Sequence, residues 1–129
     1  MNVREEVLIT KALEAGKNAY APYSDFRVGA ALLCEDGTVY TGCNIENATY
    51  GATVCAERTA IFKAVSEGHR RFAMLAITSD SEDYTSPCGI CRQVLAEFCE
   101  DNFPILMCNR TGEYTRTTLG ELLPFAFRL

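Results

Sequence analysis

The chain has 129 residues, enough for one compact domain with its own hydrophobic core, so we predict a single domain over residues 1–129. Its composition, with 48% hydrophobic and 22% charged residues, is typical of a globular protein and excludes a collagen-like, low-complexity or disordered chain. The formal net charge of −5 repels polyanions, and no cluster of Lys and Arg could follow a phosphate backbone, so we expect no nucleic-acid partner.

The first predicted elements are a helix and a β-hairpin. Apolar residues recur at helical intervals over residues 3–20, which predicts an amphipathic helix. Residues 26–33 and 39–44 favour strands, and an Asp-Gly turn signal at residues 36–37 lies between them. We therefore expect these two strands to pair as a hairpin.

A second helix and a buried strand follow the hairpin. Thr53 is the expected N-cap of a helix that runs to Glu67, and Gly68 is the expected stop of this helix. Residues 72–78 are almost continuously apolar, which predicts a strand in the interior of the sheet.

A third helix and a second buried strand come next. Ser86 is an N-cap candidate, and Pro87 suits the first position of a helix that runs to about Cys99. Residues 103–108 are again apolar and predict another strand of the interior.

The end of the chain completes the predicted sheet. A short strand over residues 114–117 and a last turn of helix over residues 119–123 are expected. After the opening helix, the order of elements indicates one mixed sheet with helices on its faces. The predicted fold class is α/β, as a single three-layer α/β/α domain with a mixed five-stranded sheet.

The cysteine count and the N-terminal segment indicate the compartment. No apolar run approaches the ~20 residues of a membrane span, and charged side chains at residues 4–6 stand where a signal peptide would be apolar. We therefore expect a cytoplasmic protein without a membrane partner. In that reducing compartment, an odd number of seven cysteines indicates metal ligands and buried thiols rather than disulfides.

Three cysteines have the spacing of metal ligands. Cys88 and Cys91 are three residues apart at the start of a predicted helix, about 60° around it, so both thiolates can face one ion. A helix N-terminus also favours the thiolate form of cysteine. With Cys55 as a third ligand, the set fits a catalytic zinc site, which keeps three protein ligands and leaves a position for water or substrate.

The remaining cysteines and the single histidine are weaker candidates. These cysteines are Cys34, Cys43, Cys99 and Cys108. Cys99 lies about 12 Å along the helix from Cys91, too far to share its ion. The other three lie in strand patterns and are interpreted as small buried hydrophobic residues. His69 follows a glycine in a predicted loop and is interpreted as a solvated residue rather than a ligand.

Glu57 indicates that the metal site is hydrolytic, because an activated water needs a carboxylate to accept its proton. On a regular helix Cys55 and Glu57 are ~200° apart, so both can reach one site only at the helix end. The alternative interpretation is a first-turn glutamate that complements the helix dipole.

At these residues the sequence resembles the zinc-dependent cytidine deaminases, in the short class with three cysteine ligands. Residues 55–58 (CAER) and 87–91 (PCGIC) resemble the CAE and PCxxC motifs, and residues 42–48 and 121–127 resemble further family segments in the same order. The resemblance implies the cytidine deaminase-like fold, a Zn²⁺ cofactor and hydrolytic deamination of cytidine and deoxycytidine in pyrimidine salvage. The products would be uridine or deoxyuridine and ammonia.

The resemblance implies roles for the metal-site residues. Cys55, Cys88 and Cys91 would bind zinc, and Glu57 would act as the proton shuttle of the wider zinc deaminases. Arg58 would donate hydrogen bonds to the cysteine ligands. Such donors offset the net charge of −1 that three thiolates leave on a divalent ion.

The resemblance also implies the substrate contacts. Asn44 and Glu46 would hydrogen-bond the ribose hydroxyls, the Ala56 N–H would contact the edge of the base, and Phe26 would pack near the base. Phe127 would reach the pocket of a neighbouring subunit, where an aromatic ring can stack on the pyrimidine. This last contact implies a homotetramer with composite active sites.

Three alternatives remain open from the sequence. A structural zinc module serving as a scaffold would need a fourth protein ligand, and a redox protein would use the CxxC pair alone. A deaminase of another cytosine nucleoside would share the whole metal site. A free nucleoside is favoured over a nucleotide because the motif segments supply only Arg27, Arg58 and Arg92 for phosphate binding.

Overall fold

The computed structural model describes residues 3–129, so the first two positions of the predicted N-terminal segment, Met1 and Asn2, lie outside the described residues. The helices are α1 (Val3–Gly16), α2 (Ala56–Ser66), α3 (Gly89–Phe98) and α4 (Leu119–Leu122), with a 3₁₀ turn η1 (Tyr50–Ala52) before α2. The strands are β1 (Val28–Cys34), β2 (Val39–Cys43), β3 (Phe72–Ser79), β4 (Pro104–Cys108) and β5 (Tyr114–Thr118).

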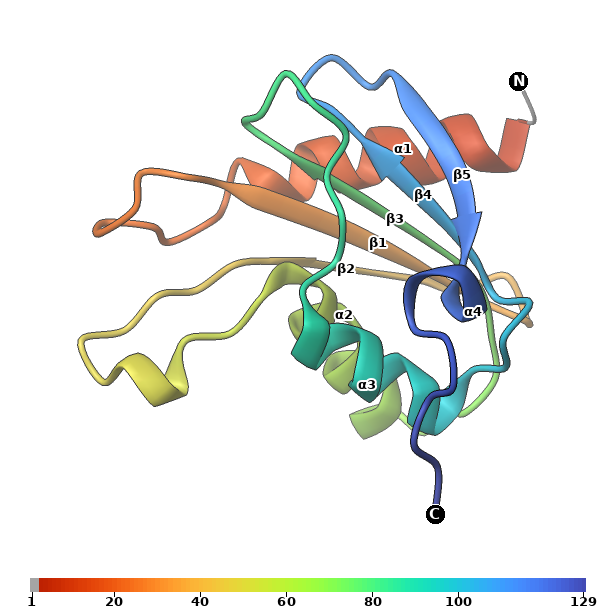
Figure 1. Ribbon diagram of the computed structural model, residues 1–129. Helices are drawn as coiled ribbons and strands as arrows, with labels where there is room; N and C mark the ends of the chain where they lie inside the picture. Colours follow the sequence, from red (N-terminus) through yellow and green to blue (C-terminus); the bar gives the residue numbers. More distant parts are fainter. Residues whose placement is uncertain (1–2) are drawn as a thin grey trace.

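The strands form one five-stranded sheet in the order β2-β1-β3-β4-β5. Strands β3 and β4 are parallel, and the other three neighbouring pairs are antiparallel. Helix α1 covers one face of the sheet, and α2, α3 and α4 cover the other (Figure 1). The prediction of a three-layer α/β fold with a mixed five-stranded sheet is confirmed.

Each face of the sheet carries its own hydrophobic core, because successive side chains of a strand point to opposite faces. In β1, Ala30 and Leu32 belong to the core on the side of α2 and α3. Ala31 and Leu33 belong to the core under α1. Burial of the strand on both faces explains why this segment is continuously apolar.

The predicted hairpin between β1 and β2 is present. Its turn uses Gly37, whose φ of +94° lies in the left-handed region that glycine adopts without strain. The Gly37 N–H donates to the Cys34 carbonyl at 3.0 Å, and Leu33 pairs with Val39 in the antiparallel register.

The first helix ends four residues earlier than the sequence predicts. Residues 17–19 donate their N–H groups to carbonyls three residues back, which is turn geometry, and α1 itself stops at Gly16. The Tyr20 N–H then donates to the Asn44 carbonyl at 3.0 Å. Pairing with the segment after β2 therefore draws Tyr20 out of the helix that its spacing predicted.

The predicted start of α2 is wrong, although its end is confirmed. Thr53 closes η1, with its N–H donating to Tyr50, and the N-cap of α2 is Cys55. At the other end Gly68 has a φ of +98°, and the following His69 N–H donates to the Ala64 carbonyl at 3.0 Å. This is the glycine stop that the sequence predicts.

The predicted start of α3 is also wrong, by two residues. The N-cap is Cys88 rather than Ser86, whose hydroxyl donates to the Met107 sulfur at 3.3 Å instead. Pro87 therefore precedes the helix. Strands β3, β4 and β5 and helix α4 agree with their predicted ranges to within one residue. Within residues 3–129, no helix is long and apolar enough to cross a bilayer.

Candidate metal centre and active site

The two cysteine motifs meet where α2 and α3 begin. Both helices lead into strands that run in the same direction, because β3 and β4 are parallel. As N-caps, Cys55 and Cys88 have extended backbones, with ψ values of 156° and 162°. The Cys55 and Cys88 sulfurs lie 3.3 Å apart, and the Cys88 and Cys91 sulfurs lie 3.2 Å apart. Residues 33 positions apart thus share one cluster.

The donor set of this cluster fits zinc. Tetrahedral Zn²⁺ with Zn–S bonds of about 2.3 Å holds its sulfurs about 3.8 Å apart, so small side-chain rotations would open the cluster enough. All three sulfurs already lie within 4.8 Å of one another. Among residues 3–129, this group of ligand atoms contains the three cysteines and no fourth side chain. The closed four-ligand site of a structural zinc module is therefore not formed within the described chain.

The other four cysteines lie elsewhere, and all seven are free thiols. Burial raises the pKa of Cys99 and Cys108 to about 12, as expected for cysteines that serve as small hydrophobic residues. Cys34 is buried as predicted, whereas Cys43 is only half-buried. The side chain of His69 is 23% exposed and packs against Tyr40, so it is less solvated than the sequence predicts.

Arg58 supplies positive charge to the cluster. Its Nη2 donates to the Cys55 sulfur and to the Thr53 carbonyl, each at 3.5 Å. A hydrogen bond from Cys91, followed by those from Arg58 and Cys88, lowers the pKa of Cys55 to about 5. The same contact with Cys55 raises the pKa of Cys91. One thiolate is therefore stable at neutral pH before any ion adds its charge.

Glu57 lies beside the cluster and is almost inaccessible, with 3% of its surface exposed. Its Oε2 accepts the Cys88 N–H at 3.3 Å. Burial raises the pKa of Glu57, and the negative charge of Cys55 adds to this effect. Because Cys55 is the N-cap and Glu57 is in the first turn, both reach one point despite their angular separation. The site lies at a helix end, as the spacing requires.

Comparison with known proteins decides the family. A family model for the cytidine and deoxycytidylate deaminase zinc-binding region matches residues 2–107.

The chain belongs to this deaminase family.

Its membership confirms the resemblance seen in the sequence and the zinc cofactor that the resemblance implies. The chain is 57% identical over 122 residues to a cytidine deaminase of Sporosarcina psychrophila, covering 95% of this chain and 90% of the relative. It is 51% identical over 122 residues to a cytidine deaminase of Halalkalibacterium halodurans, covering 95% and 92%.

A solved deaminase structure supports the same assignment. The crystal structure of cytidine deaminase from Burkholderia pseudomallei superposes with a TM-score of 0.92 at 45% sequence identity. The match covers 98% of this chain and 100% of the other. The deaminase fold is therefore shared over nearly the whole length.

Asn44 and Glu46, the predicted ribose contacts, lie on the segment after β2. The Asn44 Oδ1 accepts the Val28 N–H and its Nδ2 donates to the Phe26 carbonyl, both at 2.8 Å. The Glu46 carboxylate accepts the Tyr23 N–H at 2.9 Å, together with the N–H and hydroxyl of Ser24. Both side chains thus hold the loop before β1, a structural role that the sequence did not reveal.

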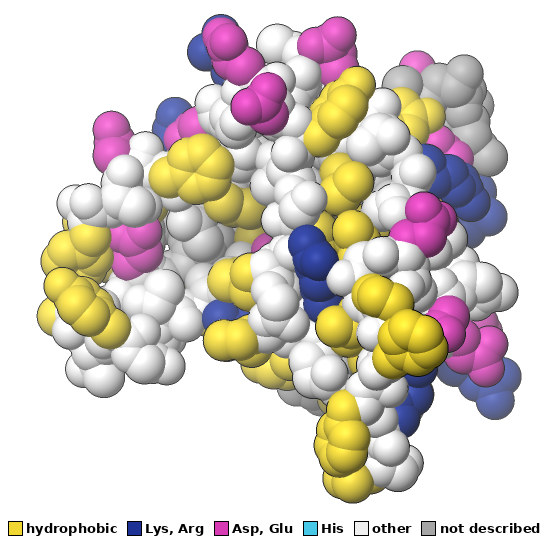
Figure 2. Space-filling view, in the orientation of Figure 1, with side chains coloured by type: hydrophobic (Ala, Val, Ile, Leu, Met, Phe, Trp, Pro, Cys, Tyr) yellow, Lys and Arg dark blue, Asp and Glu magenta, His cyan; other side chains and the backbone are white. Residues whose placement is uncertain are grey.

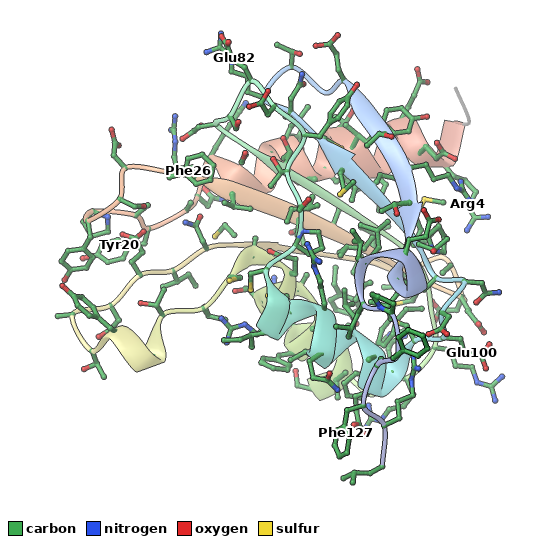
Figure 3. All side chains as sticks on the ribbon, viewed as in Figure 1. Arg4, Tyr20, Phe26, Glu82, Glu100 and Phe127 are labelled. Carbon is green, nitrogen blue, oxygen red and sulfur yellow. The ribbon has the colours of Figure 1, made fainter. Side chains whose placement is uncertain are left out.

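The other predicted substrate contacts lie in different parts of the molecule. Ala56 is fully buried in the first turn of α2, where backbone N–H groups have no intrahelical acceptor. Phe26 is 40% exposed and precedes β1. Phe127 is 68% exposed on the C-terminal segment, far from Phe26 in the view of Figure 3. Within one chain the two rings are not brought together.

Three further residues position the site, and no sequence motif predicted this role for them. Gly42 lets α2 approach β2, since a Cβ there would lie 2.5 Å from the Ala56 carbonyl oxygen. The Thr59 hydroxyl ties α2 to β2 by donating to the Cys43 carbonyl at 3.0 Å. The Arg92 guanidinium holds the segment before Cys88 by donating to the Pro87 carbonyl at 2.8 Å.

Proposed function

We propose that this chain hydrolyses the 4-amino group of free cytidine and deoxycytidine, giving uridine or deoxyuridine and ammonia. The observation that carries the proposal is a buried carboxyl, Glu57, hydrogen-bonded to the backbone of Cys88 within a three-cysteine metal cluster. The activity named for the relatives agrees with this chemistry.

Each site residue has a defined task in the proposed reaction. Cys55, Cys88 and Cys91 would hold Zn²⁺, which when bound supplies a Lewis acid that lowers the pKa of water from ~15.7 toward ~7. Glu57 accepts a proton from the attacking water and delivers it to the ring nitrogen beside C4. The same carboxylate would then take the proton of the new C4 hydroxyl and pass it to the amine, so that the C4 carbonyl forms as ammonia leaves. A pKa raised by burial suits a group that both accepts and donates a proton near neutral pH.

The ribose contacts follow from the groups on the segment after β2. The hydrogen bond from the Ser24 side chain lowers the pKa of Glu46, so its carboxylate is an ionised acceptor. Each carboxylate oxygen has two lone pairs, so Glu46 can accept a sugar hydroxyl in addition to its contacts with the loop. The Asn44 amide retains a second N–H that can donate to the sugar.

A free nucleoside suits this site better than a nucleotide. Arg27 pairs with Asp80 at 3.3 Å, and Arg58 donates to Cys55. Arg92 donates to the carbonyls of Pro87 and Leu122. All three arginines near the motifs are thus engaged within the chain. We expect cytidine and deoxycytidine to be hydrolysed faster than their 5′-phosphates.

The decisive test follows the ultraviolet spectrum of cytidine with protein of measured zinc content. The parent should convert cytidine to uridine, whereas Glu57→Gln should retain zinc and lose about 10²–10⁴-fold in kcat. Glu14→Gln, at an exposed position of α1, is the matched control and should match the parent. A parent with at least one zinc per chain that leaves cytidine unchanged would contradict the assignment and favour another cytosine nucleoside or a structural site.

The proposal includes a homotetramer in which neighbouring chains complete the active sites. Large apolar side chains are exposed on α2, α3 and the C-terminal segment, including Phe62, Ile90 and Phe125. Figure 2 shows apolar side chains over α3 and the C-terminal segment at the bottom of the molecule. A hollow lined by Phe62, Ile90 and Val94 adjoins this surface. Surfaces of this kind support association between copies.

The setting of the reaction is part of the same proposal. Seven free thiols suit the reducing cytoplasm, where cysteines remain unpaired. Release of uridine from cytidine fits pyrimidine salvage. Cells that require cytidine as their pyrimidine source and lack this protein should grow poorly, and expression of the parent but not Glu57→Gln should restore growth.

A further inference from the structure

A second cluster of metal-ligand side chains lies at the opposite end of α2 from the three-cysteine site. The ligand atoms of Cys34, Asp36 and His69 lie within 4.8 Å of one another. Helix α2 separates the two clusters by 11 residues, about 16 Å of helix. We propose that Cys34, Asp36 and His69 form a second site for a divalent transition metal of the Zn²⁺ class.

The backbone fixes the two loops that contribute these residues. Cys34 ends β1 and pairs with Phe72 of β3, and the Glu35 N–H donates to the Arg71 carbonyl at 3.1 Å. These contacts hold the β1–β2 turn beside the loop between α2 and β3. His69 is in turn fixed by the hydrogen bond from its N–H to Ala64. Ligands 35 positions apart in the chain therefore have a defined relative position.

The donor atoms of Asp36 and His69 form a loose ion pair whose spacing suits a bridging metal ion. Asp36 uses Oδ1 to accept the Thr38 N–H at 3.0 Å and turns Oδ2 toward His69. The distance from this Oδ2 to the His69 Nδ1 is 3.7 Å, too long for a hydrogen bond. Two ligands of a tetrahedral zinc ion stand about 3.4 Å apart. The Tyr40 ring packs against the His69 imidazole at 5.3 Å and restricts its rotation.

The charge and the donor types select the ion. A thiolate from Cys34 and a carboxylate from Asp36 together balance a charge of +2, while His69 binds as the neutral imidazole. Burial raises the pKa of Cys34, so it is a thiol without metal and binding releases its proton to solvent. Sulfur and nitrogen donors favour Zn²⁺ or Co²⁺ over Mg²⁺ or Ca²⁺. The Asp36 side chain is 59% exposed, which leaves a path for water to a fourth position.

Zinc stoichiometry tests this site independently of the proposed deaminase activity. Chelator-treated protein is dialysed against a small excess of Zn²⁺, and bound zinc per chain is counted by mass spectrometry. The parent should hold two zinc ions per chain, and Asp36→Asn and His69→Gln should each hold one. Both variants should retain cytidine turnover, because neither residue belongs to the three-cysteine site. Cys108→Ala, which removes a buried thiol of β4 outside both clusters, should keep two.

Cobalt substitution identifies the ligands directly. A Co²⁺-loaded parent would have four cobalt–thiolate bonds, and Cys34→Ala should lose about a quarter of the sulfur-to-cobalt charge-transfer intensity. Cys108→Ala should lose none. If the parent holds one zinc per chain, or if His69→Gln binds as much zinc as the parent, the second site does not exist. A parent with two zinc ions and no cytidine turnover would overturn the proposed function alone.

Discussion

Arg58 is a cation that helps to keep a proposed metal ligand deprotonated. The hydrogen bond from Cys91, followed by the contact with Arg58, lowers the pKa of Cys55 to about 5, so the thiolate is present above that pH and is lost as the pH falls through it. The Nε of the same side chain is buried without a hydrogen-bond partner among the described residues. A buried N–H without an acceptor costs folding free energy, and attraction between the guanidinium and the neighbouring cysteine sulfurs can offset this cost.

Replacing Arg58 by Ala should therefore weaken zinc binding. Without the guanidinium the pKa of Cys55 rises, protons compete with zinc at higher pH, and the pH of half-maximal zinc retention moves upward. The affinity at neutral pH should fall by about 10–100-fold, as for other residues that support metal ligands.

The measurement is bound zinc after dialysis across a pH series. Arg110→Ala, which removes an exposed arginine paired with Glu82, should leave the midpoint unchanged. Equal midpoints for parent and Arg58→Ala would show that the contact does not act on the ligands.

At the scale of elements, the site depends on how closely α2 lies on β2. A Cβ at Gly42 would meet the Ala60 nitrogen at 2.6 Å, so a side chain there must displace the start of α2. Gly29 makes a similar close approach between β1 and α1, since a Cβ there would lie 2.0 Å from the Ala12 carbonyl oxygen. Substitutions at Gly42 and Gly29 therefore perturb helix packing on one face of the sheet at a time.

Both Gly42→Ala and Gly29→Ala should destabilise the fold by about 1–3 kcal/mol or more, because each overpacks a helix against a strand. Only Gly42→Ala should also reduce zinc retained per folded chain, since α2 carries Cys55 and Glu57 at its start. Thermal unfolding and zinc content measured on the same samples separate the two effects. If both variants retained zinc equally, the position of α2 would not limit the geometry of the site.

The order of elements was predictable from the sequence, but the starts of two helices were not. Thr53 and Ser86 were chosen as N-caps because their side chains can hydrogen-bond to a first turn. In the structure the N-caps of α2 and α3 are Cys55 and Cys88, and neither side chain makes a capping hydrogen bond. Capping preference concerns only local stability, whereas these cysteines take extended backbones that aim their sulfurs at a common point.

The same limit applies to residues whose role depends on distant partners. The three cysteines and Glu57 could be singled out from the sequence because each motif is short and local, and the structure brings them together. The close approach at Gly42 required knowing which helix lies above it. The grouping of Cys34 with His69 required the pairing of β1 with β3, which no local pattern contains.

At the scale of the whole molecule, the proposed tetramer predicts that activity depends on association. Phe127 is exposed on a C-terminal segment that extends beyond α3, and its carbonyl accepts a hydrogen bond from Gln93 at 2.8 Å (Figure 1). The segment is thus attached to α3 while its aromatic ring faces outward. This geometry supports delivery of the ring to a neighbouring chain.

Phe127→Ala should lower kcat/KM for cytidine by roughly 10-fold, the effect of losing one base–aromatic stacking contact of about 1.4 kcal/mol. Dilution of the parent below the concentration at which the tetramer dissociates should lower its specific activity. The mass of the assembly, measured by light scattering, should fall over the same range of concentration. Val7→Ala is the control, because Val7 is half-exposed on α1, on the other side of the sheet from the C-terminal segment. This variant should change neither kcat/KM nor the mass of the assembly. Full kcat/KM in the Phe127 variant would contradict the composite site.

The parallel pairing of β3 with β4 also determines when the metal can be captured. Cys55 stands before α2 and Cys88 before α3, and only the register of these two strands brings the starts of both helices together. Loops of this length close slowly compared with local turns. The complete ligand set therefore exists only in chains in which β4 has paired with β3. Binding of zinc by all three cysteines should then report that the native strand pairing has formed.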